Sequence, residues 1–109
     1  MVNTRLDFHK LLVSALGSKN VYFQPPESKS LTYPCIVYKL ASIPEKYADN
    51  TSYTNEYMYK VTLMHEDPDN DIVDKLLKIK HSKFENHYAT QGLNHYVFNI
   101  YHKNEKEIK

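Results

Sequence analysis

The sequence contains very little glycine and cysteine, and it has no tryptophan. Its 109 residues include two glycines, Gly17 and Gly92. Phosphate-binding loops use glycines to let the backbone approach the phosphates, so this scarcity argues against a nucleotide-binding protein. Cys35 is the single cysteine, which excludes an internal disulfide and a cysteine-rich zinc site.

Long apolar runs and an excess of one charge are also missing. No stretch reaches the ~18 apolar residues that cross a bilayer, and 14 basic residues are balanced by 13 acidic ones. A protein dedicated to nucleic acid normally carries a clear basic excess. We therefore expect neither a membrane nor a specific nucleic acid as a partner. The composition is that of an ordinary globular protein.

Two stretches have the apolar spacing of amphipathic helices. The first covers residues 4–16, with one apolar face formed by Phe8, Leu11, Leu12, Ala15 and Leu16. Thr4 is placed to cap its start, and Gly17 to end it in the left-handed conformation. The second begins in the acidic stretch from residue 66, where Asp67 or Asp69 is the expected cap. Its periodic positions are Ile72, Val73, Leu76, Leu77 and Lys80.

Five stretches favour strands: residues 21–23, 30–41, an alternating run from Tyr57, 84–90 and 93–103. Tyr57 and Tyr59 fall on the same face as Val61 and Leu63, so we expect them to pack in the sheet. Pro34 lacks a donor and belongs at the start of its strand or on an unpaired edge. Gln91-Gly92 predicts a hairpin.

These elements predict one α+β domain over residues 1–103, in the order α-β-β-β-α-β-β. We expect a mainly antiparallel sheet of four to five strands, with both helices packed on one face. The charged residues 104–109 are expected to fray.

Metal chemistry is the main enzymatic alternative, because the chain has six histidines. His87 and His95 flank the predicted turn and could face each other across the hairpin. Two histidines without a third ligand make a poor zinc site. A small metal-dependent hydrolase using His65, Asp67 and His87 therefore stays the less favoured hypothesis.

Other signals of catalysis are weak. Asp67, Asp69 and Asp71 have the spacing of a calcium loop, but the positions that need glycine and glutamate hold Ile72 and Lys78. Cys35 lies in an apolar strand and is expected to be structural. No known catalytic motif occurs. We expect no catalytic residue, no metal and no cofactor.

Ten tyrosines are the unusual part of the composition. Residues 42–52 predict a loop, and Tyr47 and Tyr53 flank its polar centre with Asp49 and Asn50. Tyrosine offers a large contact area at low entropic cost, so we interpret these four residues as a candidate interface loop. An exposed loop without a partner is the alternative.

Four segments resemble the tail terminator, or tail completion (tail-to-head joining), proteins of long-tailed bacteriophages. They are VYFQPPESKSLTYPCIVYKL (21–40), YADNTSY (47–53), YKVTLMHEDPDNDI (59–72) and GLNHYVFNIY (92–101). The resemblance implies a small α+β subunit of the virion, assembled in the host cytoplasm, that forms a hexameric ring on the head-proximal end of the tail tube. It also implies contacts with the tail-tube protein and a neck protein, without catalysis or a cofactor. A related phage neck or minor tail protein is the alternative.

Overall fold

The computed structural model describes residues 5–43 and 56–103 of the chain. Their elements are α1 (Arg5–Leu16), β1 (Val21–Phe23), β2 (Cys35–Ser42), β3 (Glu56–His65), α2 (Ile72–Leu77), β4 (Ser82–Thr90) and β5 (Leu93–Lys103). The predicted α+β class and the order of the elements are confirmed. The predicted cap Thr4 and the charged tail 104–109 lie outside the described residues.

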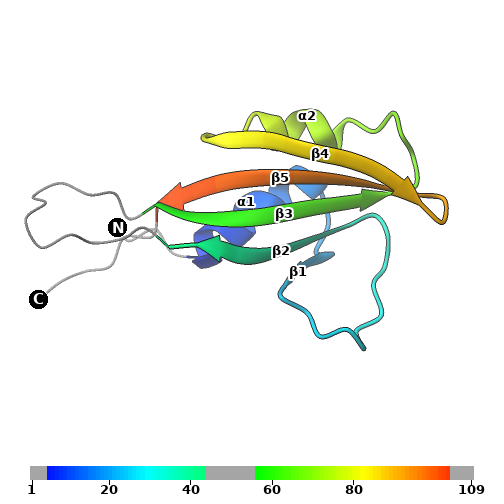
Figure 1. The fold of residues 1–109 in the computed structure, drawn as a ribbon, viewed down its shortest axis with the longest axis horizontal. Helices are drawn as coiled ribbons and strands as arrows, with labels where there is room; N and C mark the ends of the chain where they lie inside the picture. Colours follow the sequence, from blue (N-terminus) through cyan, green and yellow to red (C-terminus); the bar gives the residue numbers. More distant parts are fainter. Residues whose placement is uncertain (1–4, 44–55, 104–109) are drawn as a thin grey trace, which may run out of the picture.

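The five strands form one mixed sheet in the order β1-β2-β3-β5-β4 (Figure 1). Three of the four neighbouring pairs are antiparallel, as predicted. β1 is parallel to β2, with Val21 opposite Ile36, and this pairing was not anticipated. Residues 30–34, which were assigned to the second strand, belong instead to the connection that carries the chain back to the start of β2. Pro34 directly precedes β2, in agreement with the first of its two predicted positions, and its peptide bond is cis.

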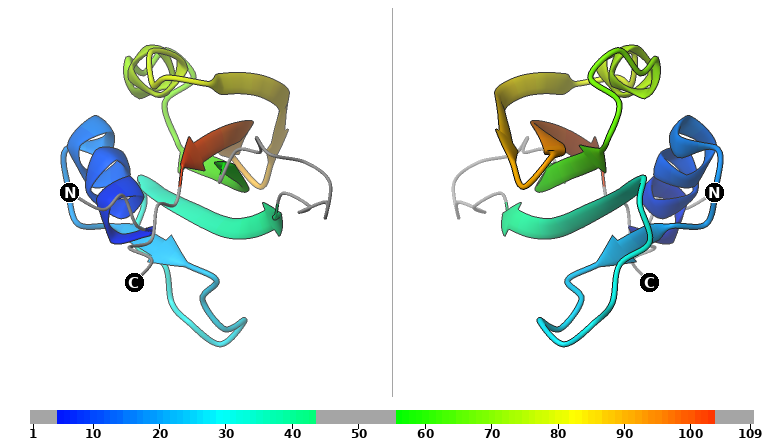
Figure 2. Two further views of the ribbon diagram at one scale, coloured as in Figure 1. Left: turned by 90° about the vertical axis from the view of Figure 1, so that its left-hand side faces the viewer. Right: turned by 90° about the vertical axis from the view of Figure 1, so that its right-hand side faces the viewer.

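Both helices lie on one face of the sheet (Figure 2), as expected, and enclose a single apolar core. Its fully buried members include Phe8, Leu12, Ile36, Tyr38, Val61, Leu63, Leu76, Phe98 and Ile100. Leu11 was assigned to the apolar face of α1, but its side chain is 45% exposed. At about 100° per residue, Leu11 stands at the edge of the stripe that Phe8, Leu12 and Leu16 bury.

Two sharp turns occur where the sequence predicts them. Gly17 ends α1 with a φ of +82°, and its N–H donates to the carbonyl of Val13 at 2.8 Å. Gln91 and Gly92 both have positive φ and connect the paired residues Thr90 and Leu93. Positive φ at both central residues is typical of the tight type I′ hairpin turn, whose twist matches the flanking strands.

The helix α2 is shorter than the spacing predicts, and its start is capped by the side chain of Asn70, one residue before the N-cap position at Asp71. The side-chain oxygen of Asn70 accepts hydrogen bonds from the N–H groups of Ile72 and Val73 at 3.0 and 3.2 Å. The Asp67 carboxylate instead accepts a hydrogen bond from the N–H of Asp69 at 2.9 Å. This bond stabilises the turn before the helix. The prediction of Asp67 or Asp69 as cap was therefore wrong. Both residues belong to a tight turn that precedes the helix.

The predicted sheet tyrosine Tyr59 lies in an aromatic cluster beneath α1. Its ring stacks on Phe8 at a centroid distance of 4.7 Å, and Tyr38 contacts both rings edge-on. The Tyr38 hydroxyl accepts a hydrogen bond from Arg5 at 3.0 Å and shares another with Nδ1 of His9 at 2.7 Å. Arg5 and His9 thus satisfy the Tyr38 hydroxyl, which α1 would otherwise bury without a partner.

The partly buried position of His9 beside Arg5 predicts a stability that falls in acid. Burial, together with the positive charge of Arg5, lowers the pKa of His9 below its ordinary value of 6.5. The unfolded chain therefore takes up this proton first as the pH falls through 6.5, which lowers the free energy of unfolding. Urea unfolding of the wild type should lose more stability between pH 7.5 and pH 5.5 than that of His9→Gln. An equal loss in both proteins would contradict the assignment.

Candidate functional site

The candidate interface loop lies outside the described residues. Tyr47, Asp49, Asn50 and Tyr53 belong to residues 44–55, which connect β2 to β3. Their role in binding therefore stays a prediction from the sequence.

The two histidines of the hairpin do not face each other, which corrects the expectation from the sequence. His87 pairs with Tyr96 and His95 pairs with Tyr88, so their side chains point to opposite faces of the sheet. Each imidazole stacks on the tyrosine opposite it, with ring centroids 4.6 Å apart in both pairs. The histidines are thus packing residues of the hairpin.

The hypothetical hydrolase site is likewise not assembled. Nδ1 of His65 accepts the N–H of Asp67 at 3.0 Å, which is turn chemistry at the end of β3. Nε2 of His87 contacts the side-chain oxygen of Asn94 at 3.2 Å. Within residues 5–43 and 56–103, no three histidine, cysteine or acidic side chains gather closely enough to hold a metal ion. The same described residues include no helix long and apolar enough to cross a membrane.

Cys35 lies fully buried at the start of β2. Burial raises the pKa of its thiol to about 11, so the reactive thiolate is scarce at neutral pH. These features are those of a structural cysteine.

We expect Cys35→Ala to lower the free energy of unfolding by about 1 kcal/mol, because a small buried side chain leaves a small cavity. The thiol of the folded wild type should react slowly with a thiol reagent, at a rate set by opening of the fold. Labelling as fast as that of the urea-unfolded chain would contradict this placement.

The face of the sheet opposite the helices has no described helix above it (Figure 2). We call it the uncovered face. It carries the side chains that alternate with the core positions: Cys35, Val37, Lys39, Met58, Lys60, Thr62, Met64, Lys83, Asn86, Tyr88, His95, Val97, Asn99 and Tyr101, of which Cys35 and Val97 are buried. Many are half-buried or exposed in the single chain. The strand alternation predicts the members from each strand, but only the register places them side by side.

A row of lysines crosses the uncovered face. Lys39 is paired with Lys60, Lys60 with Asn99, and Asn99 with Lys83, so four adjacent strands contribute one position each. We call this set the lysine row. Like charges directly opposite each other on a sheet are unfavourable. A negatively charged group bound along the row would therefore reduce the repulsion between its lysines.

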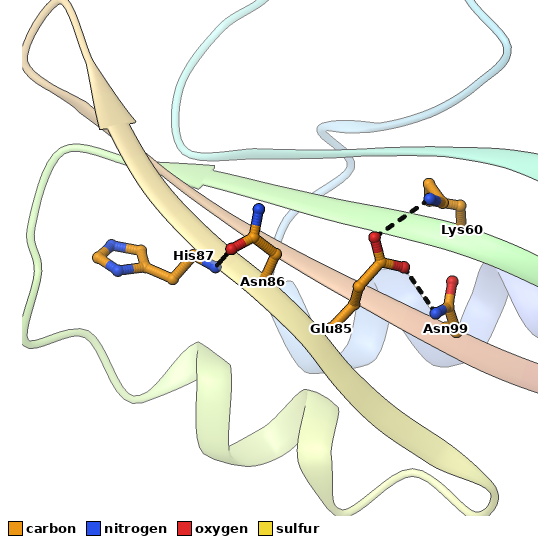
Figure 3. Close-up of polar contacts among 5 residues, drawn as sticks. All are labelled: Lys60, Glu85, Asn86, His87 and Asn99. Carbon is orange, nitrogen blue, oxygen red and sulfur yellow. Dashed lines mark hydrogen bonds and ion pairs between the residues drawn. The ribbon is translucent and has the colours of Figure 1, made fainter.

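Glu85 supplies the chain's own negative charge to this row (Figure 3). One carboxylate oxygen accepts from the side-chain N–H of Asn99 at 2.7 Å, and the other pairs with Nζ of Lys60 at 3.3 Å. These hydrogen bonds, with that of Asn99 foremost, lower the pKa of Glu85. A bulge between Phe84 and Asn86 places Glu85 outside the regular pairing, and bulges commonly re-aim a side chain in this way.

An open hollow adjoins the row between β2, β3 and the segment after β1. Its volume is about 430 Å³, and Val37, Thr62 and Pro25 line it together with Lys39 and Lys60. The hollow combines an apolar floor with two ammonium groups. Such a surface suits an amphipathic segment that carries carboxylates.

The edge of the sheet at β4 is also open within the described part of the chain. Nearly every residue of β4 is exposed, and Phe84 and Tyr88 are 48% and 46% exposed on opposite faces. Exposed aromatics on an edge strand are typical of surfaces that become buried in an assembly.

A second charged surface runs from the end of β3 into the first turn of α2. Residues 66–74 contain Glu66, Asp67, Asp69, Asp71 and Asp74 without a basic residue, and all five acidic side chains are exposed. We call this stretch the acidic segment. Acidic residues at the start of a helix stabilise its positive end, and here Asp71 stands at the N-cap position and Asp74 in the first turn of α2.

The arrangement as a whole is suited to binding protein surfaces. It offers an uncovered sheet face, an exposed edge strand and two patches of opposite charge on a small domain. Comparisons with known protein families, with curated proteins and with solved structures find no match.

Proposed function

We propose that the protein is a structural subunit of a bacteriophage tail that associates with itself into a ring. The resemblance of residues 21–101 to tail terminator proteins motivates the phage assignment. The uncovered face supports self-association most directly, because a sheet with one open face and exposed aromatics gains stability when another surface covers it. The α+β fold is compatible with this role.

In this proposal the ring sits on the head-proximal end of the tail tube, ends its polymerisation and joins the tail to the head. Its partners are further copies of the chain, the tail-tube protein and a neck protein, and its location is the virion. The formal charge of +1 suits a ring through which DNA passes, since each phosphate neutralised by a lysine or arginine would add affinity and hold the DNA.

Light scattering of the purified protein and electron microscopy of assembled tails test this proposal. We expect a molar mass that is a multiple of the 12.9-kDa chain, and rings when the protein is imaged. Tails assembled with the protein should have uniform length, whereas tubes assembled without it should be overlong. Uniform tails in its absence would contradict the terminator role. Uniform tails that fail to join heads in its absence would identify a neck protein instead.

The candidate interface loop gives a separate prediction. Replacing Tyr47 and Tyr53 by serine should change the melting temperature little, because surface substitutions usually stay within ~0.5 kcal/mol. The same change should weaken binding to a neighbouring subunit or partner, because truncated interface tyrosines often cost more than ~1 kcal/mol. Unfolding of this variant with unchanged association when cold would place both tyrosines in the core.

A further inference from the structure

We propose that the uncovered face binds the acidic segment of a second copy of this chain. Each subunit then contacts two neighbours through two different surfaces. The inference deepens the proposed ring function and rests on it for one point, that the chain associates with itself.

The uncovered face has unmet positive charge. Within the described part of the chain, Lys39 and Lys83 have no ion-pair partner, whereas Lys60 pairs with Glu85. The position of Glu85 shows that a carboxylate fits on the row, because its two oxygens reach Lys60 and Asn99 together. Further carboxylates on this face would offset the repulsion between the lysines.

The acidic segment is an ordered and complementary partner. The Asp67 carboxylate accepts a hydrogen bond from the N–H of Asp69, and the side-chain amide of Asn70 donates one to the backbone carbonyl of Asp67 at 2.8 Å. The turn is therefore fixed before any contact forms, and little conformational freedom is lost on binding. Pro68, which is exposed in the turn, adds an apolar group that suits the apolar floor of the hollow.

The two surfaces lie on different sides of the molecule. The lysine row is on the uncovered face, whereas the acidic segment leaves the end of β3 and leads into α2 on the helix-covered side (Figures 1 and 2). Each copy therefore offers its acidic segment to the next copy while its own uncovered face stays open. Contacts between two different surfaces close into rings or continue as filaments. Two uncovered faces packed on each other would instead bring two lysine rows together, which like-charge repulsion disfavours.

Charge reversal on each surface tests the contact. The face variant is Lys39→Glu with Lys83→Glu, which leaves the Lys60–Glu85 pair intact. The segment variant is Glu66→Lys with Asp69→Lys, which spares the turn bond of Asp67. Sedimentation velocity at low salt should show self-association weakened by about tenfold or more in each variant, because opposed charges become like charges. Mixing the two variants should restore the association, since the reversed surfaces complement each other.

Matched controls reverse the same kinds of charge elsewhere. Lys10→Glu with Lys19→Glu, and separately Glu27→Lys, alter exposed residues of α1 and of the connections around β1. They should associate like the wild type, and all variants should keep its circular dichroism and melting temperature. Association of the reversed variants at wild-type strength would overturn the contact, and so would a mixture that fails to recover.

Two further outcomes are distinguishable. A titration with a 20-nucleotide DNA probe checks whether the face binds nucleic acid instead. DNA binding that the face variant loses, with its self-association unchanged, would overturn the inference. A wild-type protein that remains a single chain in solution would overturn it together with the self-association of the proposed function, whereas the terminator role would still be decided by tail lengths.

Discussion

Replacing Tyr59 by alanine is expected to lower the free energy of unfolding by about 3 kcal/mol or more, the cost of truncating a large aromatic core residue. The Tyr59 side chain is 2% exposed. It stacks on Phe8 and contacts Tyr38, so its removal opens a cavity between α1 and the sheet. Urea unfolding followed by circular dichroism measures the loss directly.

Tyr101→Ala is the matched control for this prediction. Tyr101 directly follows Ile100, the residue paired with Tyr59, but lies on the uncovered face, where its side chain is 37% exposed. Its truncation should cost well below half as much in the single chain. Equal losses for Tyr59 and Tyr101 would mean that the uncovered face is as tightly packed as the core.

The second large effect is expected at Leu76. This side chain is fully buried, and with Ile72 it anchors the six-residue helix α2 to the core. Such a short helix has little stability of its own and depends on tertiary packing. Leu76→Ala should therefore lower the free energy of unfolding by about 2–5 kcal/mol. Because Leu76 holds α2 on the core, amide hydrogen exchange within α2 should also become faster in this variant.

Leu77→Ala provides a control at the next residue. Leu77 is 43% exposed, so the same substitution removes the same atoms from a largely solvated position. The measured loss should stay within about 0.5 kcal/mol, as for other surface changes. A loss at Leu77 as large as that at Leu76 would show that α2 packs by a different face.

Much of this fold is predictable from local sequence because periodicity and turn chemistry agree. The alternation of Tyr57, Tyr59 and Val61 identifies both β3 and its buried face. Gly92, between two alternating runs, identifies the hairpin, since glycine accepts the positive φ that such a turn requires. Gly17 marks the end of α1 for the same reason.

Features that depend on distant residues are not predictable in this way. The parallel pairing of β1 and β2 is invisible in the three residues of β1, because local sequence does not state a strand's partner. The cap Asn70 was missed because several neighbouring residues can cap and only the path of the turn decides between them. Leu11 has the right periodicity, but the width of the contact between α1 and the sheet leaves it outside.

The lysine row, too, is only partly predictable from local sequence. Alternation correctly assigns Lys39 and Lys60 to the side of their strands away from the core. Lys83 lies in the same row only because of the pairing register of four strands, and this register cannot be predicted from any one segment. The acidic segment is visible in the sequence, but its spacing there predicts only the start of a helix.

The bulge at Glu85 also reverses, by one residue, the order in which the side chains of β4 alternate between the two faces of the sheet. Phe84 and His87 both point to the helix-covered side, although residues three apart on a regular strand face opposite ways. Deleting Glu85 alone would bring Phe84 and Asn86 into unbroken pairing with Phe98 and Val97, leaving every other side chain on its present face. Deleting a residue on the other side of the bulge, such as Tyr88, would instead turn Asn86 and His87 over. The bulge is thus a place in β4 where the chain can lose a residue without reversing the side chains on either side of it.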